Sequence, residues 1–205
     1  MYEPDQFGRI WLDGDFFIAP FGYFDKDYEY VINYLRDPVT ASRTFFDGFN
    51  EGEILQLYAG YLKNGHGWIG FHKNKRAGYL ILDTISFHPL IYSIHGGIDK
   101  KLFGKGYGTK SMEFIKHFAF KTKCASKVEG YELKKNSLIT GYFKCGGLTK
   151  ECELKDRILV DGVLKPISIY GLSSKDYLDR PKKKEVKKGK RKRKRKRKRK
   201  RKRRS

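Results

Sequence analysis

Cysteine is scarce in this chain, and the three that occur are not spaced as metal ligands. Cys124, Cys145 and Cys152 form no CxxC pair and no Cys/His pattern, so we expect free thiols in a reducing compartment and no metal site. No apolar run approaches the roughly 18–20 residues that span a bilayer, and no signal peptide opens the chain. These absences predict an intracellular, cytoplasmic protein without a membrane span.

Acidic residues are almost absent from the end of the chain, so the sequence has two parts that differ in net charge. Residues 182–205 hold 20 of the 45 Lys and Arg residues and one of the 23 acids, a formal charge of +19, while residues 1–181 carry only +3. With 205 residues and 39% hydrophobic content, the chain is long enough for one folded core. We therefore expect a nearly neutral folded domain over residues 1–180 and a polybasic tail over residues 181–205.

The tail alternates Lys and Arg from Lys190 to Lys202 without an apolar residue. Such a segment repels itself and has nothing to bury, so it is predicted to be disordered when free. We expect it to bind nucleic acid without sequence preference by releasing counterions. The alternatives are a nuclear localisation signal, a nucleic-acid-condensing arm and a tract expanded with little purpose. The first two would place the protein in the nucleus or in a virion. The representative binding residues are Lys190, Arg191, Lys192, Arg193, Lys194 and Arg195.

Residues 1–180 alternate strand-like and helix-like patterns, which predicts an α+β (α/β) fold. Asp13-Gly14 and Asp161-Gly162 each separate two strand-like runs as in a hairpin turn. Strands are predicted at 9–12, 15–19, 67–72, 78–83, 90–98, 127–133, 151–160 and 163–172, and helices at 24–37, 40–62, 110–122 and 136–147.

A glycine-rich stretch from Leu102 to Thr109 leads into the helix-like segment at 110–122. Gly104, Gly106 and Gly108 allow positive φ and a close approach of the main chain to a ligand. The helix start behind them offers unpaired N–H groups and the positive end of a dipole. This combination binds phosphate groups. The stretch matches neither the P-loop nor the Rossmann pattern.

The order of these segments, a strand followed by Gly-Lys-Gly-Tyr-Gly-Thr and a helix, resembles the acetyl-CoA signature of the GNAT N-acetyltransferases. That family's loop, Gln/Arg-x-x-Gly-x-Gly/Ala, aligns on residues 103–108, with Phe103 in place of the usual Gln or Arg. Residues 136–147 resemble the family's "Asn, then Tyr-x-Lys-x-Gly-Phe" helix through Tyr142, Lys144 and Gly146. Residues 167–177 resemble the closing strand and exit of members that acetylate ribosomal proteins. The resemblance covers roughly residues 15–178.

The resemblance implies a mixed central sheet of about six to seven strands flanked by helices, with acetyl-CoA as acyl donor. It also implies a bulge, placed here at Gly96-Gly97, that splays one strand from the next so that the pantetheine arm lies in the wedge. The residues implied to bind the cofactor are Ile98, Phe103, Gly104, Lys105, Gly106, Tyr107, Gly108, Thr109 and Asn136.

Acetyl transfer to an amine needs an acid for the leaving thiolate and a route for the ammonium proton. Tyr142 stands where the resembling family places its acid, although a tyrosine on a helix facing a sheet is also a common core residue. His95 is the first candidate base because its unperturbed pKa is near 6.5, with a structural histidine as the alternative. Asp83 is the second candidate, and ordered water is a third route.

The sequence therefore predicts an N-acetyltransferase whose acceptor is a small molecule, a protein N-terminus or a lysine side chain. The alternative is a catalytically decayed GNAT-fold protein, viral or chromatin-associated, that acts as a structural or nucleic-acid-condensing protein. Phe103, Gly147 in place of the family's phenylalanine, and the missing carboxylate on the strand at 90–98 favour this alternative.

Overall fold

The computed structural model describes residues 2–22, 26–37, 40, 49–133, 137–160 and 162–179, and the polybasic tail lies outside this part. None of the described helices is long and apolar enough to cross a membrane. The elements are β1 (Ile10–Asp13), β2 (Phe16–Pro20), α1 (Asp27–Arg36), α3 (Glu51–Asn64), β3 (His66–His72), β4 (Lys75–Phe87), β5 (Leu90–Ile98), α4 (Tyr107–His117), β6 (Lys127–Glu132), α5 (Ser137–Gly146), β7 (Thr149–Val160), β8 (Val163–Ser173) and α6 (Ser174–Asp179).

The strands form one mixed sheet in the order β1-β2-β3-β4-β5-β6-β8-β7. This confirms the predicted α/β class with a mixed central sheet, and the sheet has eight strands where six to seven were expected. Both predicted hairpins are present, as β1–β2 and β7–β8. Part of the helix predicted at 40–62 falls on residues that are not described, and the described part contains α3 from Glu51 onward.

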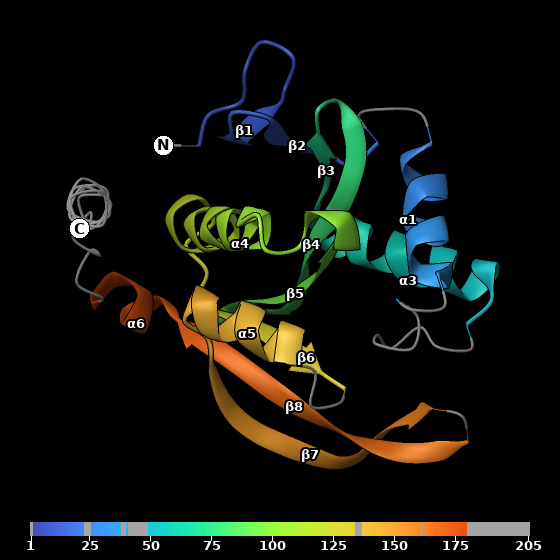
Figure 1. The fold of residues 1–205 in the computed structure, drawn as a ribbon. Coiled ribbons are helices and arrows are strands. Elements are labelled where there is room, and N and C mark those ends of the chain that lie inside the picture. The colour runs from blue at the N-terminus through green and yellow to red at the C-terminus, as the bar shows by residue number, and fades with distance from the viewer. Residues whose placement is uncertain are drawn as a thin grey trace, which may run out of the picture.

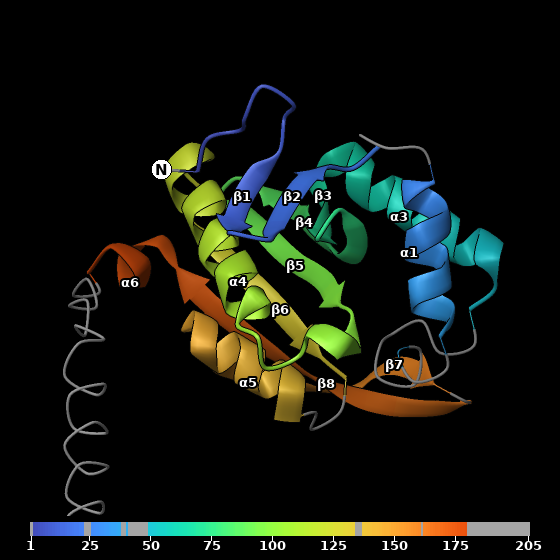
Figure 2. The same ribbon diagram turned by 45° about the horizontal axis from the view of Figure 1, so that its top comes forward.

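Helices cover both faces of the sheet, as Figures 1 and 2 show, and each face has its own cluster of buried apolar residues. One face packs against α4 and α5 through a cluster that includes Met112, Ile115 and Phe143. The other packs against α1 and α3 through a cluster that includes Leu35, Ile54 and Ile81. The apolar residues of each helix recur every three to four positions, which gives it one face to bury. A capping box, in which Asn50 and Glu53 satisfy each other's main-chain N–H groups, fixes the start of α3.

Strands β5 and β6 run parallel but pair only over three residues each. The pairs are Ile91 with Lys127, Tyr92 with Val128 and Ser93 with Glu129, although β5 continues to Ile98 and β6 to Glu132. We call the point after Ser93 and Glu129, where the two strands stop pairing, the fork.

The prediction of a bulge at Gly96-Gly97 is wrong. Both glycines pair in regular register with β4, and the register shift lies on β4 itself, between Thr84 and Ser86. A different constraint explains Gly97. A Cβ there would lie 2.5 Å from the Tyr34 hydroxyl, which donates to the carbonyl of Ile98 at 3.0 Å. The glycine therefore admits α1 to the end of β5.

Candidate functional site

The glycine-rich stretch forms a turn that ends at the first residue of α4. Gly104 and Gly106 take φ values of 75° and 87°, in the left-handed region that favours glycine. Gly106 is the N-cap of α4 and offers no side chain to bond the first N–H groups of the helix. These N–H groups therefore remain directed out of the helix end, where an anion would be stabilised.

Tyr107 fixes the start of α4 against the sheet. Its ring stacks on Phe16 of β2 with the centroids 4.5 Å apart, and its hydroxyl donates to Asp15 at 2.8 Å. The ring is 6% exposed. Tyr107 thus anchors the helix end through packing and one hydrogen bond.

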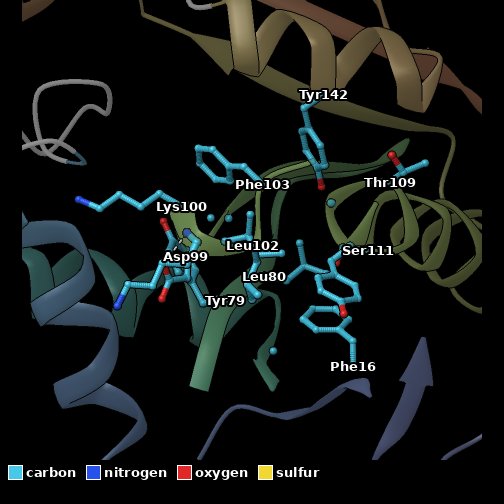
Figure 3. A pocket seen from close by; sticks show the side chains of 18 of the residues that line it. Phe16, Tyr79, Leu80, Asp99, Lys100, Leu102, Phe103, Thr109, Ser111 and Tyr142 are labelled. Atoms are coloured by element: carbon cyan, nitrogen blue, oxygen red, sulfur yellow. Dashed lines mark hydrogen bonds between the residues drawn. The ribbon is translucent and has the colours of Figure 1, made fainter. Parts of the chain in front are cut away.

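A cavity of about 700 Å³ opens in front of this helix end. Its walls come from β2, β4 and β5, from the turn after β5, from α4 and α5, and from α1 and the residues that follow it. Lys100 and Lys101 bring positive charge to the wall beside the turn. The cavity therefore joins a phosphate-compatible helix end to a largely apolar interior, as Figure 3 shows.

Tyr142 points from α5 into this cavity (Figure 3). A Cβ on Gly108 would lie 3.6 Å from its ring, so the tyrosine packs beside the second residue of α4. Burial raises the pKa of Tyr142 above its ordinary value, so the hydroxyl stays protonated at neutral pH. The buried carboxylate of Glu132 positions α5, because it accepts hydrogen bonds from Thr140 at 2.6 Å and from Tyr170 of β8 at 2.9 Å.

Neither a protein-family model nor a curated protein matches this sequence. The search of solved structures found many similar folds. A spermidine N-acetyltransferase from Vibrio cholerae, in complex with CoA and spermine, aligns at TM-score 0.69 and 13% identity over 82% of this chain and 100% of that chain. The acetyltransferase from Salmonella typhimurium that modifies the N-terminal serine of ribosomal protein L7/L12 aligns at TM-score 0.68 and 11% identity over 80% and 98%. A GNAT-family acetyltransferase from Bacillus anthracis aligns at TM-score 0.65 and 17% identity over 78% and 96%.

The chain has the GNAT fold. The predicted resemblance to GNAT N-acetyltransferases, including members that acetylate ribosomal proteins, is confirmed at the level of the fold. Because the identities are 11–17%, the alignments establish the architecture, and the chemistry has to be argued from the residues of the cavity.

The cavity of this GNAT fold gathers most of the residues predicted to bind the cofactor. The exception among the described ones is Lys105, which is exposed and does not line it. Asn136 lies outside the described residues. The predicted residues that line the cavity are Ile98, Phe103, Gly104, Gly106, Tyr107, Gly108 and Thr109.

His95 and Asp83, the candidate bases, do not line the cavity. They lie on the sheet face covered by α1 and α3, where His95 stacks on Tyr61 of α3 with the centroids 4.4 Å apart. The Nε2 atom of His95 is buried and has no hydrogen-bond partner among the described residues. Burial lowers the pKa of His95 to about 4 and raises the pKa of Asp83. At neutral pH His95 is therefore uncharged.

Several cavity residues carried no signal in the sequence. Tyr34, Asp37 and Thr40 reach the cavity from α1 and the residues after it, and Phe16 reaches it from β2. Only the fold brings these segments to the glycine-rich turn. Lys100 and Lys101 could have been noticed, because two lysines directly before a phosphate-binding turn are a local signal. Within the described ranges, no three His, Cys, Asp or Glu residues are placed to hold a metal ion.

The buried imidazole predicts a stability that depends on pH. A free histidine has a pKa near 6.5, so between that value and about 4 the unfolded chain binds a proton that folded His95 does not. The stability is present above pH ~6.5 and is lost as pH falls. Between pH 7 and pH 5 the wild type should lose about 2 kcal/mol more unfolding free energy than His95→Gln, as measured by urea denaturation. The same loss in both proteins would show that His95 titrates normally.

Proposed function

We propose that this protein is an N-acetyltransferase that takes its acetyl group from acetyl-CoA and transfers it to a primary amine. The observation that carries the proposal is the cavity, in which an uncapped helix end and Tyr142 face the same space. A decayed GNAT-fold protein would be expected to have a filled cleft, whereas this cavity measures about 700 Å³. The open cavity supports the enzymatic interpretation.

The cavity fits the parts of acetyl-CoA in order. The N–H groups at the start of α4, with Lys100 and Lys101 nearby, suit the phosphates. The apolar wall, which includes Leu80 and Ile98, suits the pantetheine arm. Because phosphate contacts through main-chain amides do not need a particular side chain, Phe103 in place of Gln or Arg is compatible with binding.

Tyr142 is proposed to protonate the leaving thiolate of CoA. Burial raises its pKa and so keeps the hydroxyl protonated at neutral pH, and the hydroxyl points into the cavity (Figure 3). The ammonium proton of the acceptor would leave on the opposite face of the sheet, near the fork. Asp83 on that face is a better base than an ordinary aspartate because burial raises its pKa.

The polybasic tail is proposed to bind nucleic acid through phosphates alone. Residues 182–205 carry +19 and contain no aromatic side chain for base stacking. The tail would bring the enzyme to nucleic acid or to ribosomes, and a nuclear signal or a condensing arm are the other uses of the same charge.

Thiol release from acetyl-CoA tests the enzymatic proposal. The assay compares spermidine, a peptide with an N-terminal serine and a peptide containing lysine, since similar folds act on spermidine and on an N-terminal serine. At least one amine should raise thiol release well above the rate without protein. No increase with any of them, in protein shown to bind CoA, would favour the decayed GNAT-fold alternative.

Tyr142→Phe should lower turnover by roughly one to three orders of magnitude, the range for a lost general acid, with little change in CoA affinity. The side chain keeps its shape and loses only its hydroxyl, and no hydrogen bond of that hydroxyl to another described residue is disturbed. Steady-state kinetics with acetyl-CoA measures the effect. Unchanged turnover would assign Tyr142 to the core and remove it as the acid.

A further inference from the structure

A row of polar side chains crosses the sheet at the fork, on the face opposite Tyr142. Asp83 of β4 pairs with Ser93 of β5, and Ser93 pairs with Glu129 of β6. Directly paired residues project to the same face of a sheet, so these three form one line, which we call the polar row. Ser93 is 1% exposed, and its hydroxyl has no hydrogen-bond partner among the described residues. All three side chains carry oxygen atoms that can accept a hydrogen bond from an ammonium group.

The polar row carries negative charge at the place where an acceptor amine would meet the cofactor. Asp83 forms no ion pair with another described residue. Glu129 shares the single ammonium of Lys127 with Glu151, at 2.9 and 2.6 Å, so two carboxylates face one cation. At the cavity itself, Asp37 and Asp99 are balanced by Lys100 and Lys101, so the net negative charge lies on the polar row. Such a surface attracts a cationic acceptor and repels an acidic one.

The polybasic tail begins close to this row. Gly171 of β8 pairs with Glu129, and β8 ends two residues later at Ser173. The six residues of α6 then lead to Asp179. Three strand residues span about 10 Å and six helical residues about 9 Å. The tail therefore starts within roughly 20 Å of the polar row.

The tail is also long enough to reach the polar row, and its lysines carry the amines that an acetyl transfer needs. The 26 residues after Asp179 span at most about 90 Å, whereas a compact domain of this size is roughly 40 Å across. Residues 182–205 contain twelve lysines and eight arginines. Tethering makes their encounter with the polar row intramolecular, which raises the effective concentration into the millimolar range when the linker can reach.

We propose that the lysine side chains of residues 182–205 are acceptors for the acetyl group, within the same chain. This inference rests on the proposed acetyltransferase function. The ε-ammonium group of a tail lysine loses one proton, and the resulting amine nitrogen attacks the thioester carbonyl carbon. A C–N bond forms, the C–S bond breaks, and the CoA thiolate takes a proton from the Tyr142 hydroxyl. The nitrogen loses its second proton as the intermediate collapses, and this proton restores the Tyr142 hydroxyl. The products are an acetylated lysine, CoA and one released proton.

Tail acetylation would weaken nucleic-acid binding, because each acetyl group removes one positive charge while the arginines keep theirs. With all twelve lysines modified, the tail charge would fall from +19 to +7. For duplex DNA, the slope of log K against log salt should decrease by about 0.9 for each phosphate contact that is lost.

The test is intact-mass analysis of the full-length protein incubated with acetyl-CoA, followed by peptide mapping. Gly108→Glu, which disrupts the helix end of the cavity, measures background chemical acetylation. We expect tail lysines of the wild type to be acetylated at least about tenfold faster than those of this variant. The rate per molecule should not depend on protein concentration. A rate that rises with protein concentration would overturn the intramolecular assignment.

A second variant, in which all twelve tail lysines are arginine, keeps the +19 charge and removes the acceptors. It should lose tail acetylation and retain thiol release with an added amine. If the wild type acetylates an added amine and leaves its tail unmodified, the tail inference is wrong and the proposed enzymatic function stands. If neither substrate is acetylated, the proposed function itself fails.

Glu129→Gln tests the role of the polar row. Removing one carboxylate should slow tail acetylation about fivefold, the effect of roughly one unit-charge contact in water, and leave CoA affinity unchanged. The difference should shrink as salt is raised, because salt screens the attraction between the approaching tail and the polar row. An unchanged rate at low salt would show that the tail lysines approach from elsewhere.

Discussion

Replacing Gly108 with glutamate is expected to weaken CoA binding by roughly two to three orders of magnitude. Gly108 is the second residue of α4 and lines the cavity. A side chain there would project toward Tyr142, since its Cβ would lie 3.6 Å from the ring. The added carboxylate would face the phosphates at the helix end. A like-charge contact near 4 Å costs about 4 kcal/mol at the effective dielectric of a protein surface, and each 1.4 kcal/mol is tenfold in affinity.

Gly108 is a better position for this test than Gly106. Gly106 has a φ of 87°, so any side chain there strains the turn and confuses folding with binding. Gly108 lies in α4, and a Cβ there makes only ordinary contacts. The variant should therefore fold and lose the ligand, as calorimetric titration would show.

The matched control is Gly60→Glu in α3. Gly60 is exposed and does not line the cavity, and a Cβ at this position would have no described atom within 4 Å. The substitution adds the same charge to a helix and should leave CoA affinity within about twofold, since surface substitutions have small effects. Equal loss in both variants would mean that net charge, and not the helix end, governs binding.

Nucleic-acid binding by the tail should collapse with salt. If six to ten phosphates are contacted, raising salt from about 50 to 200 mM should weaken binding by roughly three to five orders of magnitude. Duplexes of unrelated sequence should bind equally, because contacts to phosphates carry no base readout. Fluorescence anisotropy over a salt series, with two DNA sequences and one RNA, measures both properties.

Truncation after Pro181 is the control for that experiment. It removes 20 of the 45 Lys and Arg residues and leaves a domain with a formal charge of +3. The truncated protein should lose the salt-sensitive binding and keep its circular dichroism spectrum and CoA affinity. Tight, salt-sensitive binding by the truncated protein would place the basic surface on the folded domain.

Local signals predicted the glycine-rich part of the site, and long-range packing decided the rest. Positive φ at Gly104 and Gly106 and the start of α4 follow from neighbouring residues, which is why the turn could be predicted. The approach of Tyr34 and Phe16 to that turn depends on how α1 and β2 pack against the sheet. No local pattern encodes such a contact.

His95 and the predicted bulge show the same limit in physical terms. A histidine within an apolar strand is expected from the sequence alone to have an ordinary pKa. Burial of His95 in the core, where its ring stacks on Tyr61, lowers that pKa. Gly96-Gly97 suggested a bulge because glycine permits one. The structure uses Gly97 to admit Tyr34, while the register shift falls on β4.

A crystal structure of the protein with CoA tests the central claim most directly. The pyrophosphate should lie against the main-chain N–H groups at the start of α4, beside Gly108. The thiol should lie within hydrogen-bonding reach of the Tyr142 hydroxyl, on the cavity side of the fork. CoA bound elsewhere on the domain, or only to the polybasic tail with the cavity unoccupied, would contradict the account.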